Sequence, residues 1–383
     1  MRPLGLLNLR RPEPSMRPLL VLALLLIAMV VQPVGADAQS TEPSATDPPV
    51  FAYYYIWFDA TSWNRAKTDL PLAGKYSSDE RSVMEEHVIT AKAAGIDGFI
   101  VSWKDTLKLS TRLTQLAEIA AEHDFALVVI YQGLDFDRDP LPVDRVAEDL
   151  DFFIATYAHQ AAFRRFGKPV VILSGSWEFS AEDVASLGFG RRDDLFLLGS
   201  EKNVAGVERL RGLVDGDAYY WSSVNPETYP GYQNKLDAMS AAVHEQGGLW
   251  FAPAAAGFDA RLIGGTTVVD RLDGEQLRVQ YDAAVRSSPD AVGLISWNEF
   301  SENSHIEPSR TYGERYVDVV AELLGGESFT RDIETPDAFD SSEPGGRGSG
   351  AGQIVALSMV AAVVLGGVVV VGRRRRRPRA EAS

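Results

Sequence analysis

Between about residues 50 and 326, short apolar runs alternate with longer stretches in which apolar residues recur every three to four positions. The short runs are predicted strands, and the longer stretches have the periodicity of amphipathic helices. The strands are expected at residues 50–58, 96–103, 125–131, 169–174, 195–200, 218–222, 249–252 and 291–296. The helices are expected at residues 78–94, 110–123, 143–162, 233–246, 274–287 and 312–324.

This alternation predicts a single globular α/β domain over residues 50–326. Eight strands, each followed by a helical or loop segment, in about 280 residues are typical of a (β/α)8 or TIM barrel. A doubly wound sheet is the alternative, but no glycine-rich phosphate-binding sequence follows the first strand. In a barrel of this kind the functional site lies at the carboxyl ends of the strands.

The N-terminal segment has the pattern of a secretory signal peptide over residues 1–38. An apolar run at residues 19–31 follows Arg10, Arg11 and Arg17, and small residues come after it. The run is short for a membrane span, which favours a cleaved signal over an uncleaved anchor. Residues 39–49 are rich in Ser, Thr, Pro and Asp and are predicted to be a flexible lead-in.

The C-terminal segment has the pattern of a membrane anchor. Residues 327–353 are predicted to be a disordered linker, because Asp, Ser, Glu, Pro and Gly dominate them. Residues 354–372 are predicted to form a transmembrane helix, and residues 373–383 a basic cytoplasmic tail. We therefore expect a membrane-anchored protein at the cell surface with its globular domain extracellular. The alternative is a tail that a sortase-like protease removes and replaces with a surface anchor.

Composition narrows the classes of partner. The chain contains no cysteine, so it has no disulfide, thiolate metal site or thiol nucleophile. Its net charge of −16 argues against nucleic acid as a partner. No metal-binding spacing such as His-x-x-x-His is present, and we expect neither a metal nor a cofactor. We expect a monomer.

Aromatic and polar side chains follow the predicted strands. Indole rings can stack on the apolar faces of sugar rings, while carboxylates and amides bind the hydroxyl groups. The candidate substrate-binding residues are Tyr54, Trp57, Trp103, Gln132, Trp177, Trp221, Asp259, Arg261, Trp297, Asn298, His305 and Glu307.

Residues 297–307 hold three carboxylates, an imidazole and an indole directly after the last apolar strand. Glu299 and Glu302 would lie on one face if the chain turns helically there. One could then act as a general acid with a raised pKa, and the other as a base or nucleophile. The alternative is a solvated acidic loop that caps the next helix. His305 and Glu307 could equally order the loop, and Asp259 could simply pair with Arg261.

The sequence Trp-Asn-Glu-Phe-Ser-Glu at residues 297–302, followed by Ile-Glu-Pro at residues 306–308, resembles the end of the last strand in glycoside hydrolase family 99. Residues 53–57, 93–103 and 256–261 are similar to other segments of that family, in the expected order. The resemblance covers about residues 50–325 and departs from the family pattern at Phe300, Ser301 and residues 303–305. Residues 297–302 are also similar to the motif of family 71, the endo-α-1,3-glucanases.

The resemblance to family 99 implies a retaining endo-glycosidase on a (β/α)8 barrel. It implies that Glu299 assists the 2-hydroxyl of the substrate as that hydroxyl displaces the leaving group, which forms an anhydro-sugar. It implies that Glu302 acts as the general acid and then as the base. Because family 71 is also similar, both α-mannoside and α-glucan substrates stay open.

The resulting hypothesis is a glycoside hydrolase that cleaves α-linked polysaccharide or oligosaccharide at the cell surface with Glu299 and Glu302. A rival hypothesis is a surface carbohydrate-binding protein on a degenerate barrel, which would need neither glutamate. A structural surface protein without a sugar ligand is a third.

Overall fold

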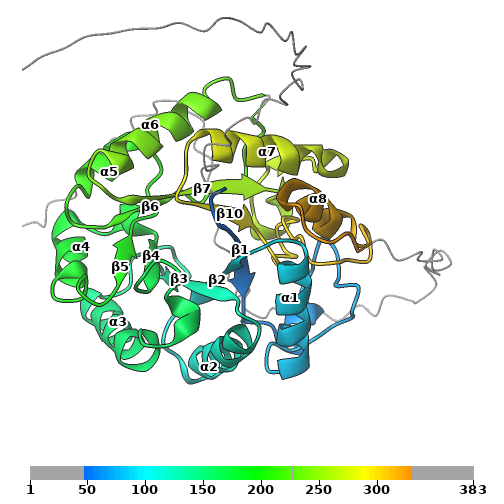
Figure 1. The fold of residues 1–383 in the computed structure, drawn as a ribbon, viewed down its shortest axis with the longest axis horizontal. Coiled ribbons are helices and arrows are strands. Elements are labelled where there is room, and N and C mark those ends of the chain that lie inside the picture. The colour runs from blue at the N-terminus through cyan, green and yellow to red at the C-terminus, as the bar shows by residue number, and fades with distance from the viewer. Residues whose placement is uncertain (1–46, 227, 330–383) are drawn as a thin grey trace, which may run out of the picture. The chain divides into compact units, whose positions relative to one another are not determined.

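The computed structural model describes residues 47–226 and 228–329, which form a barrel of parallel strands surrounded by helices (Figure 1). The barrel strands are β1 (Val50–Tyr55), β2 (Gly98–Trp103), β3 (Ala126–Gln132), β4 (Val170–Ser174), β5 (Phe196–Leu198), β6 (Gly216–Ala218), β7 (Leu249–Ala255) and β10 (Ala291–Ile295). A small antiparallel hairpin, β8 (Phe258–Asp259) with β9 (Val268–Val269), follows β7.

Helices connect the strands on the outside of the barrel (Figure 1). The α-helices are α1 (Arg81–Ala93), α2 (Leu107–Glu122), α3 (Val143–Tyr157), α4 (Ala181–Gly188), α5 (Val204–Arg209), α6 (Tyr232–His244), α7 (Glu275–Arg286) and α8 (Arg315–Leu324). Short 3-10 helices are η1 (Ser62–Asn64), η2 (Ala161–Phe163), η3 (Ser176–Glu178), η4 (Arg261–Ile263) and η5 (Leu272–Gly274).

The strand order confirms the predicted barrel. Around the sheet the strands run β5-β4-β3-β2-β1-β10-β7-β6, and all neighbouring pairs are parallel. The two outermost strands meet through a parallel bridge between Gly199 and Asp217, so the barrel is nearly closed. Chain order is kept all the way round, whereas a doubly wound sheet reverses direction at a switch point.

The sixth strand lies earlier than the sequence indicated. It was expected at residues 218–222 because those residues are mostly apolar, but β6 begins at Gly216. Gly216 has a φ of 154°, and a Cβ atom there would lie 2.1 Å from the carbonyl oxygen of Leu249. A glycine is therefore required for the close approach of β6 to β7. Because glycine is not a large apolar residue, the start of β6 did not appear as an apolar run in the sequence.

Two apolar layers hold the barrel together. Alternate residues of the strands point into the barrel, where Phe51, Tyr53, Ile100 and Ile172 belong to one buried cluster. The intervening residues point outward and pack against the amphipathic helices in a larger cluster. The direction of each strand-end side chain therefore decides whether it can reach a ligand at the mouth of the barrel.

Among the described residues, no helix is long and apolar enough to cross a membrane. The predicted signal peptide (1–38), linker (327–353), transmembrane helix (354–372) and basic tail (373–383) lie outside the described residues, apart from residues 327–329.

Candidate active site

The chain forms a compact turn directly after β10 that brings both predicted catalytic glutamates to the carboxyl end of the barrel. The hydroxyl of Ser296 accepts a hydrogen bond from the Glu299 backbone N–H at 2.9 Å. The backbone N–H of Ile306 donates to the Ser296 carbonyl at 2.8 Å and so closes the turn. Glu299 is 3% exposed and Glu302 is 1% exposed. The turn is therefore a buried acidic centre, and the alternative of a solvated acidic loop is wrong.

Asn298 fixes this turn to the first strand. Its side-chain oxygen accepts from the Tyr55 N–H at 2.8 Å, and its amide group donates to the Tyr55 carbonyl at 3.0 Å. The same amide donates to the hydroxyl of Tyr76 at 3.2 Å. Because these contacts occupy the fully buried amide, the prediction that Asn298 binds substrate is wrong. Asn298 positions the neighbouring Glu299 instead.

Burial raises the pKa of both glutamates, but their surroundings separate the two values. The pKa of Glu299 is raised to about 7 by burial, against the hydrogen bond from the Ser301 N–H and the charge of Lys67. The pKa of Glu302 is raised well above its usual range by burial and by the negative charge of Glu299, against the charge of Arg138. Both carboxylate oxygens of Glu302 have no hydrogen-bond partner among the described residues. Glu299 is therefore the easier of the two carboxyl groups to ionise, and Glu302 holds its proton more strongly.

Two tyrosines face this pair from inside the barrel. The hydroxyls of Tyr55 and Tyr220 lie 2.8 Å apart and share a hydrogen bond. Burial raises the pKa of each phenol well above its usual range, and the charges of Glu299 and Glu302 add to the increase. The tyrosines therefore stay protonated and can each donate a hydrogen bond to a sugar hydroxyl or a carboxylate.

A second buried network supports the turn from behind. The hydroxyl of Tyr76 donates to Glu307 at 2.9 Å, and Nε2 of His87 lies 3.3 Å from the other carboxylate oxygen of Glu307. The hydroxyl of Tyr54 lies 3.0 Å from Nδ1 of His87. Tyr54 belongs to the core between the sheet and the helices, which contradicts the prediction that it binds substrate. Glu307 is held by Tyr76 and His87, and its contact with a substrate stays a prediction.

Two of the predicted tryptophans also belong to the outer core. Trp103 and Trp297 are fully buried in the layer between strands and helices. Trp103 donates its indole N–H to the Ser110 hydroxyl on α2 at 3.2 Å, and the ring of Trp297 packs 5.5 Å from that of Phe99. The prediction that they bind substrate is wrong, because their side chains point away from the barrel interior.

His305 is packed inside the turn. Its ring stacks on Phe300 with a centroid distance of 4.2 Å, and Nε2 lies 3.5 Å from a carboxylate oxygen of Asp69. The imidazole is 1% exposed, and burial lowers its pKa to about 4 despite the nearby carboxylate. His305 is therefore neutral at physiological pH and packs on Phe300 within the turn, and its contact with a substrate stays a prediction.

The remaining candidates lie at the carboxyl ends of strands, as predicted. Gln132 faces the barrel interior and donates to the Ser102 hydroxyl at 2.9 Å. Trp57, Trp177 and Trp221 are each partly exposed, and Trp57 stacks on Tyr55 with a centroid distance of 4.3 Å. Their contact with a sugar stays a prediction.

Asp259 and Arg261 pair with each other. Their closest charged atoms are 2.5 Å apart, and Arg261 is largely exposed whereas Asp259 is buried. The Asp259 backbone N–H donates to the Glu302 carbonyl at 2.7 Å, which places this pair beside the acidic centre. Substrate binding by the pair stays a prediction.

Four residues that interact electrostatically with the glutamates are absent from the predicted site: Tyr55, Lys67, Arg138 and Tyr220. Tyr55 had a usable signal, because it occupies the same strand face as the barrel-lining Tyr53. Lys67 and Arg138 come from loops after β1 and β3, and no local pattern marks them. Only the fold brings these two cations to the carboxylates.

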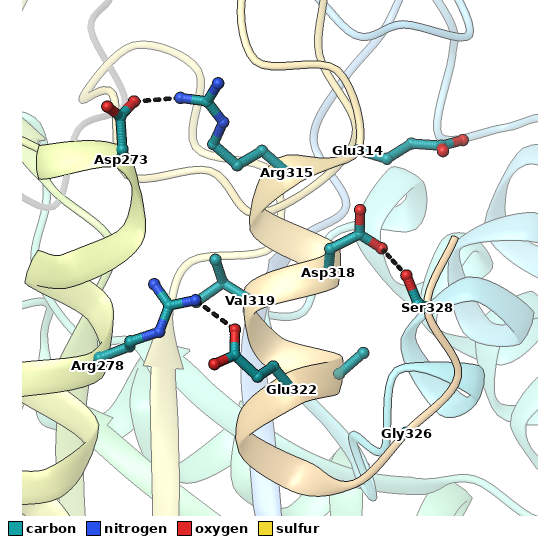
Figure 2. Close-up of a pocket in the computed structure, with 10 residues that line it drawn as sticks. Asp273, Arg278, Glu314, Arg315, Asp318, Val319, Glu322, Gly326 and Ser328 are labelled. Atoms are coloured by element: carbon teal, nitrogen blue, oxygen red, sulfur yellow. Dashed lines mark hydrogen bonds and ion pairs between the residues drawn. The ribbon is translucent and has the colours of Figure 1, made fainter. Parts of the chain in front are cut away.

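Other polar clusters on the described part of the chain do not share this arrangement. A pocket of about 670 Å³ lies beside α7 and α8, and Figure 2 shows Arg315 directed toward Asp273 and Arg278 toward Glu322. Both arginines of this pocket are thus engaged in ion pairs with neighbouring acids. The one group of described side chains close enough to share a metal ion, Glu85, Glu122 and His123, lies on the outer helices, where Glu122 is also paired with Arg81.

A nearly closed parallel barrel with two buried carboxylic acids of different pKa at its carboxyl end defines the class of a barrel glycoside hydrolase. The model of glycosyl hydrolase family 99 matches residues 59–321. The chain belongs to this family, which confirms the resemblance seen in the sequence and makes the protein an enzyme. No curated protein matches the sequence.

Solved structures agree on the fold. The family 99 endo-α-mannosidase from Bacteroides thetaiotaomicron superposes with a TM-score of 0.61 at 17% identity, covering 72% of this chain and 96% of that one. The same enzyme in complex with bis-tris-propane gives a TM-score of 0.61 at 19% identity, with the same coverage. A glycoside hydrolase-like protein gives 0.55 at 17% identity, covering 73% of this chain and 94% of that one.

Proposed function

We propose that this enzyme is an endo-acting, retaining α-mannosidase in which Glu302 is the general acid and Glu299 the base. The observation that carries the proposal is the pair of buried carboxyl groups whose surroundings separate their pKa values. The charge of Lys67 favours the ionised form of Glu299, which a base needs. Burial, the charge of Glu299 and the lack of a hydrogen-bond partner among described residues favour the protonated form of Glu302, which an acid needs.

The reaction scheme follows the family resemblance. Glu299 accepts the proton of the substrate 2-hydroxyl, whose oxygen forms a bond to the anomeric carbon. The bond to the leaving oxygen breaks, and that oxygen receives the proton of Glu302. Water then attacks the anomeric carbon and opens the anhydro-sugar. Glu302 recovers a proton from this water, and the 2-oxygen recovers its own from Glu299. Two displacements at one carbon retain its configuration.

This scheme favours α-mannosides over α-glucosides on stereochemical grounds. In an α-mannoside the 2-oxygen lies on the face of the ring opposite to the leaving group, so it can attack from behind. In an α-glucoside the two oxygens lie on the same face, and the 2-oxygen cannot displace the leaving group directly. An α-glucan substrate, which the similarity to family 71 left open, would require a different role for Glu299.

Hydrolysis of α-mannan and α-1,3-glucan by the wild type and by Glu302→Gln, Glu299→Gln and Glu148→Gln tests the proposal. Glu148 is an exposed residue of α3 and serves as the control. We expect oligosaccharides of α configuration from α-mannan with the wild type and the control, and none with the other two variants. Turnover of both polymers by Glu299→Gln would refute the assignment, as would products of inverted configuration.

An activated substrate separates the two roles. A mannosyl fluoride does not need a proton on its leaving group, so it bypasses the general acid but still needs the base. We expect Glu302→Gln to regain much of its first-step rate with such a substrate and Glu299→Gln to stay inactive. Recovery of activity by Glu299→Gln and not by Glu302→Gln would instead assign the acid role to Glu299 and the base role to Glu302.

We also propose that the enzyme acts at the cell surface. The support is the sequence pattern of residues 1–38 and 354–372. Protease treatment of intact cells, with detection of the barrel domain, tests this proposal. Resistance of the domain on intact cells and digestion after lysis would refute it.

A further inference from the structure

A basic pocket lies beside the catalytic turn. Its volume is about 370 Å³, and its walls are Trp63, Arg65, Lys67, Asp69, Leu70, Lys75 and Arg310. Four of these seven residues carry a positive charge, in a chain whose net charge is −16. The composition of such an acidic protein would predict mostly negative charge on its surface, so this cluster of positive side chains is a local exception.

The acid in this wall does not neutralise the cations. The Asp69 side chain is 4% exposed and lies 3.5 Å from His305 on its inner side. Its oxygens also accept from the Thr311 N–H at 3.2 Å and from the Leu70 N–H at 2.7 Å. The Asp69 carboxylate is thus engaged with His305 and with backbone donors.

Two of the cations have no acidic partner in the described part of the chain. Lys75 and Arg310 are exposed, and neither takes part in an ion pair between described residues. An exposed arginine offers a planar set of donors that matches phosphate, sulfate and carboxylate groups, and a lysine adds a mobile point charge. These two side chains are available to a ligand.

The pocket is built by the segments that hold the catalytic turn. The backbone N–H of Thr68 donates to the Phe300 carbonyl at 3.0 Å, and the Arg310 N–H donates to the Leu70 carbonyl at 2.9 Å. Lys67 belongs both to the pocket wall and to the surroundings of Glu299, where its charge acts on that carboxyl group. A group held in the pocket is therefore next to the reacting end of the barrel.

We propose that this pocket is a substrate subsite for an anionic substituent of the glycan. The inference rests on the proposed function, which supplies the α-linked sugar chain of the substrate. It narrows the substrate class to α-linked glycans that carry phosphate, sulfate or carboxylate groups. Lys75 and Arg310 bind the anion, and Lys67 joins the subsite to the catalytic centre. The enzyme prefers such a glycan over its uncharged counterpart.

Calorimetric binding in the Glu302→Gln background, which prevents turnover, tests the subsite. The probes are phosphorylated α-mannan, the same polymer after phosphatase treatment, a sulfated α-mannan and a uronate-bearing α-mannan. The variants are Lys75→Gln with Arg310→Gln, each substitution alone, and Arg164→Gln. Arg164 is an exposed arginine elsewhere on the barrel and controls for the loss of one positive charge.

We expect at least one charged polymer to bind about five- to tenfold more tightly than the uncharged one at low salt. This preference should shrink as salt rises from about 0.05 M to about 0.5 M, because screening weakens exposed charges. The double variant should lose the preference, each single variant part of it, and Arg164→Gln none. The charged polymer that responds to the double variant identifies the anion.

Equal binding of charged and uncharged polymers by the parent protein would overturn the inference. A preference that survives the double variant, with an unchanged thermal midpoint, would also overturn it. Failure of the proposed function has a different signature: the wild type would then bind the charged polymer with this preference but cleave neither polymer.

Discussion

Replacement of Glu299 by Gln should remove activity and make the protein more stable in mildly alkaline solution. Burial raises the pKa of Glu299 from 4.5 to about 7. The folded state thus holds a proton between these two values that the unfolded state has lost. The free energy of unfolding must therefore fall as pH rises through this range, and the loss is complete above the folded pKa.

The size of the effect follows from the width of that range. One pH unit corresponds to about 1.4 kcal/mol, so the raised pKa of Glu299 costs about 3 kcal/mol of stability at pH 8. Gln is neutral at every pH and can still accept the hydrogen bond from the Ser301 N–H. We expect Glu299→Gln and the wild type to agree within about 1 kcal/mol at pH 5. At pH 8 we expect the variant to be more stable by about 3 kcal/mol, or about 5–10 °C in thermal midpoint.

Urea unfolding at pH 5 and pH 8 measures this difference. His305 acts in the opposite direction, because burial lowers its pKa to about 4 and stability is lost as pH falls below the value of the unfolded state. Its contribution is the same in both proteins and cancels in the difference between them. Glu148→Gln on the exposed face of α3 should show the pH dependence of the wild type. A difference between Glu299→Gln and the wild type that does not change with pH would refute the reasoning.

Three further substitutions test how the centre is held. Asn298→Ala removes three buried hydrogen bonds and should cost about 2–4 kcal/mol in urea unfolding and most of the activity; a stable, fully active variant would contradict its positioning role. Lys67→Met removes a charge that lowers the pKa of Glu299, so the acidic limb of the pH–rate profile should move to higher pH. An unmoved limb would show that this cation does not act on the base. Gly216→Ala places a Cβ atom 2.1 Å from a backbone oxygen of β7 and should destabilise the fold by about 3 kcal/mol or more. Gly74→Ala has a positive φ of 95° but open space, so it should cost only about 1 kcal/mol, and equal costs would contradict the packing argument.

The fold could be predicted because its signals are local. Each barrel strand except β6 coincides with an apolar run, and six of the eight α-helices coincide with a stretch of helical periodicity. The two that were not predicted, α4 and α5, are the shortest, and so few residues carry little periodicity. The acidic centre was also local, since both glutamates lie in the turn after β10. What the sequence did not contain is the direction of each side chain at a strand end.

That direction explains the wrong substrate-binding predictions. Ser102 and Trp103 are neighbours at the end of β2, yet Ser102 points inward and accepts from Gln132, while Trp103 packs against α2. Tyr54 and Tyr55 divide in the same way at the end of β1. The sequence interpretation took Tyr54 and Trp103 as binding residues, and both belong to the core. The outward face of a barrel strand meets the helices and therefore favours large apolar side chains. At the end of β2 the smaller polar neighbour, Ser102, was the residue that faces the barrel interior.

The turn after β10 depends on a segment more than two hundred residues away in the sequence. Asn298 is held by the backbone of Tyr55, and Thr68 donates to the carbonyl of Phe300, so the loop after β1 sets the position of the turn after β10. The same loop supplies Lys67, whose charge acts on Glu299, and most of the wall of the basic pocket. A substitution of Lys67 that changes the preferred glycan should therefore also shift the pH dependence of the reaction. Substitutions around Trp177, on the other side of the barrel, should change glycan affinity without that shift.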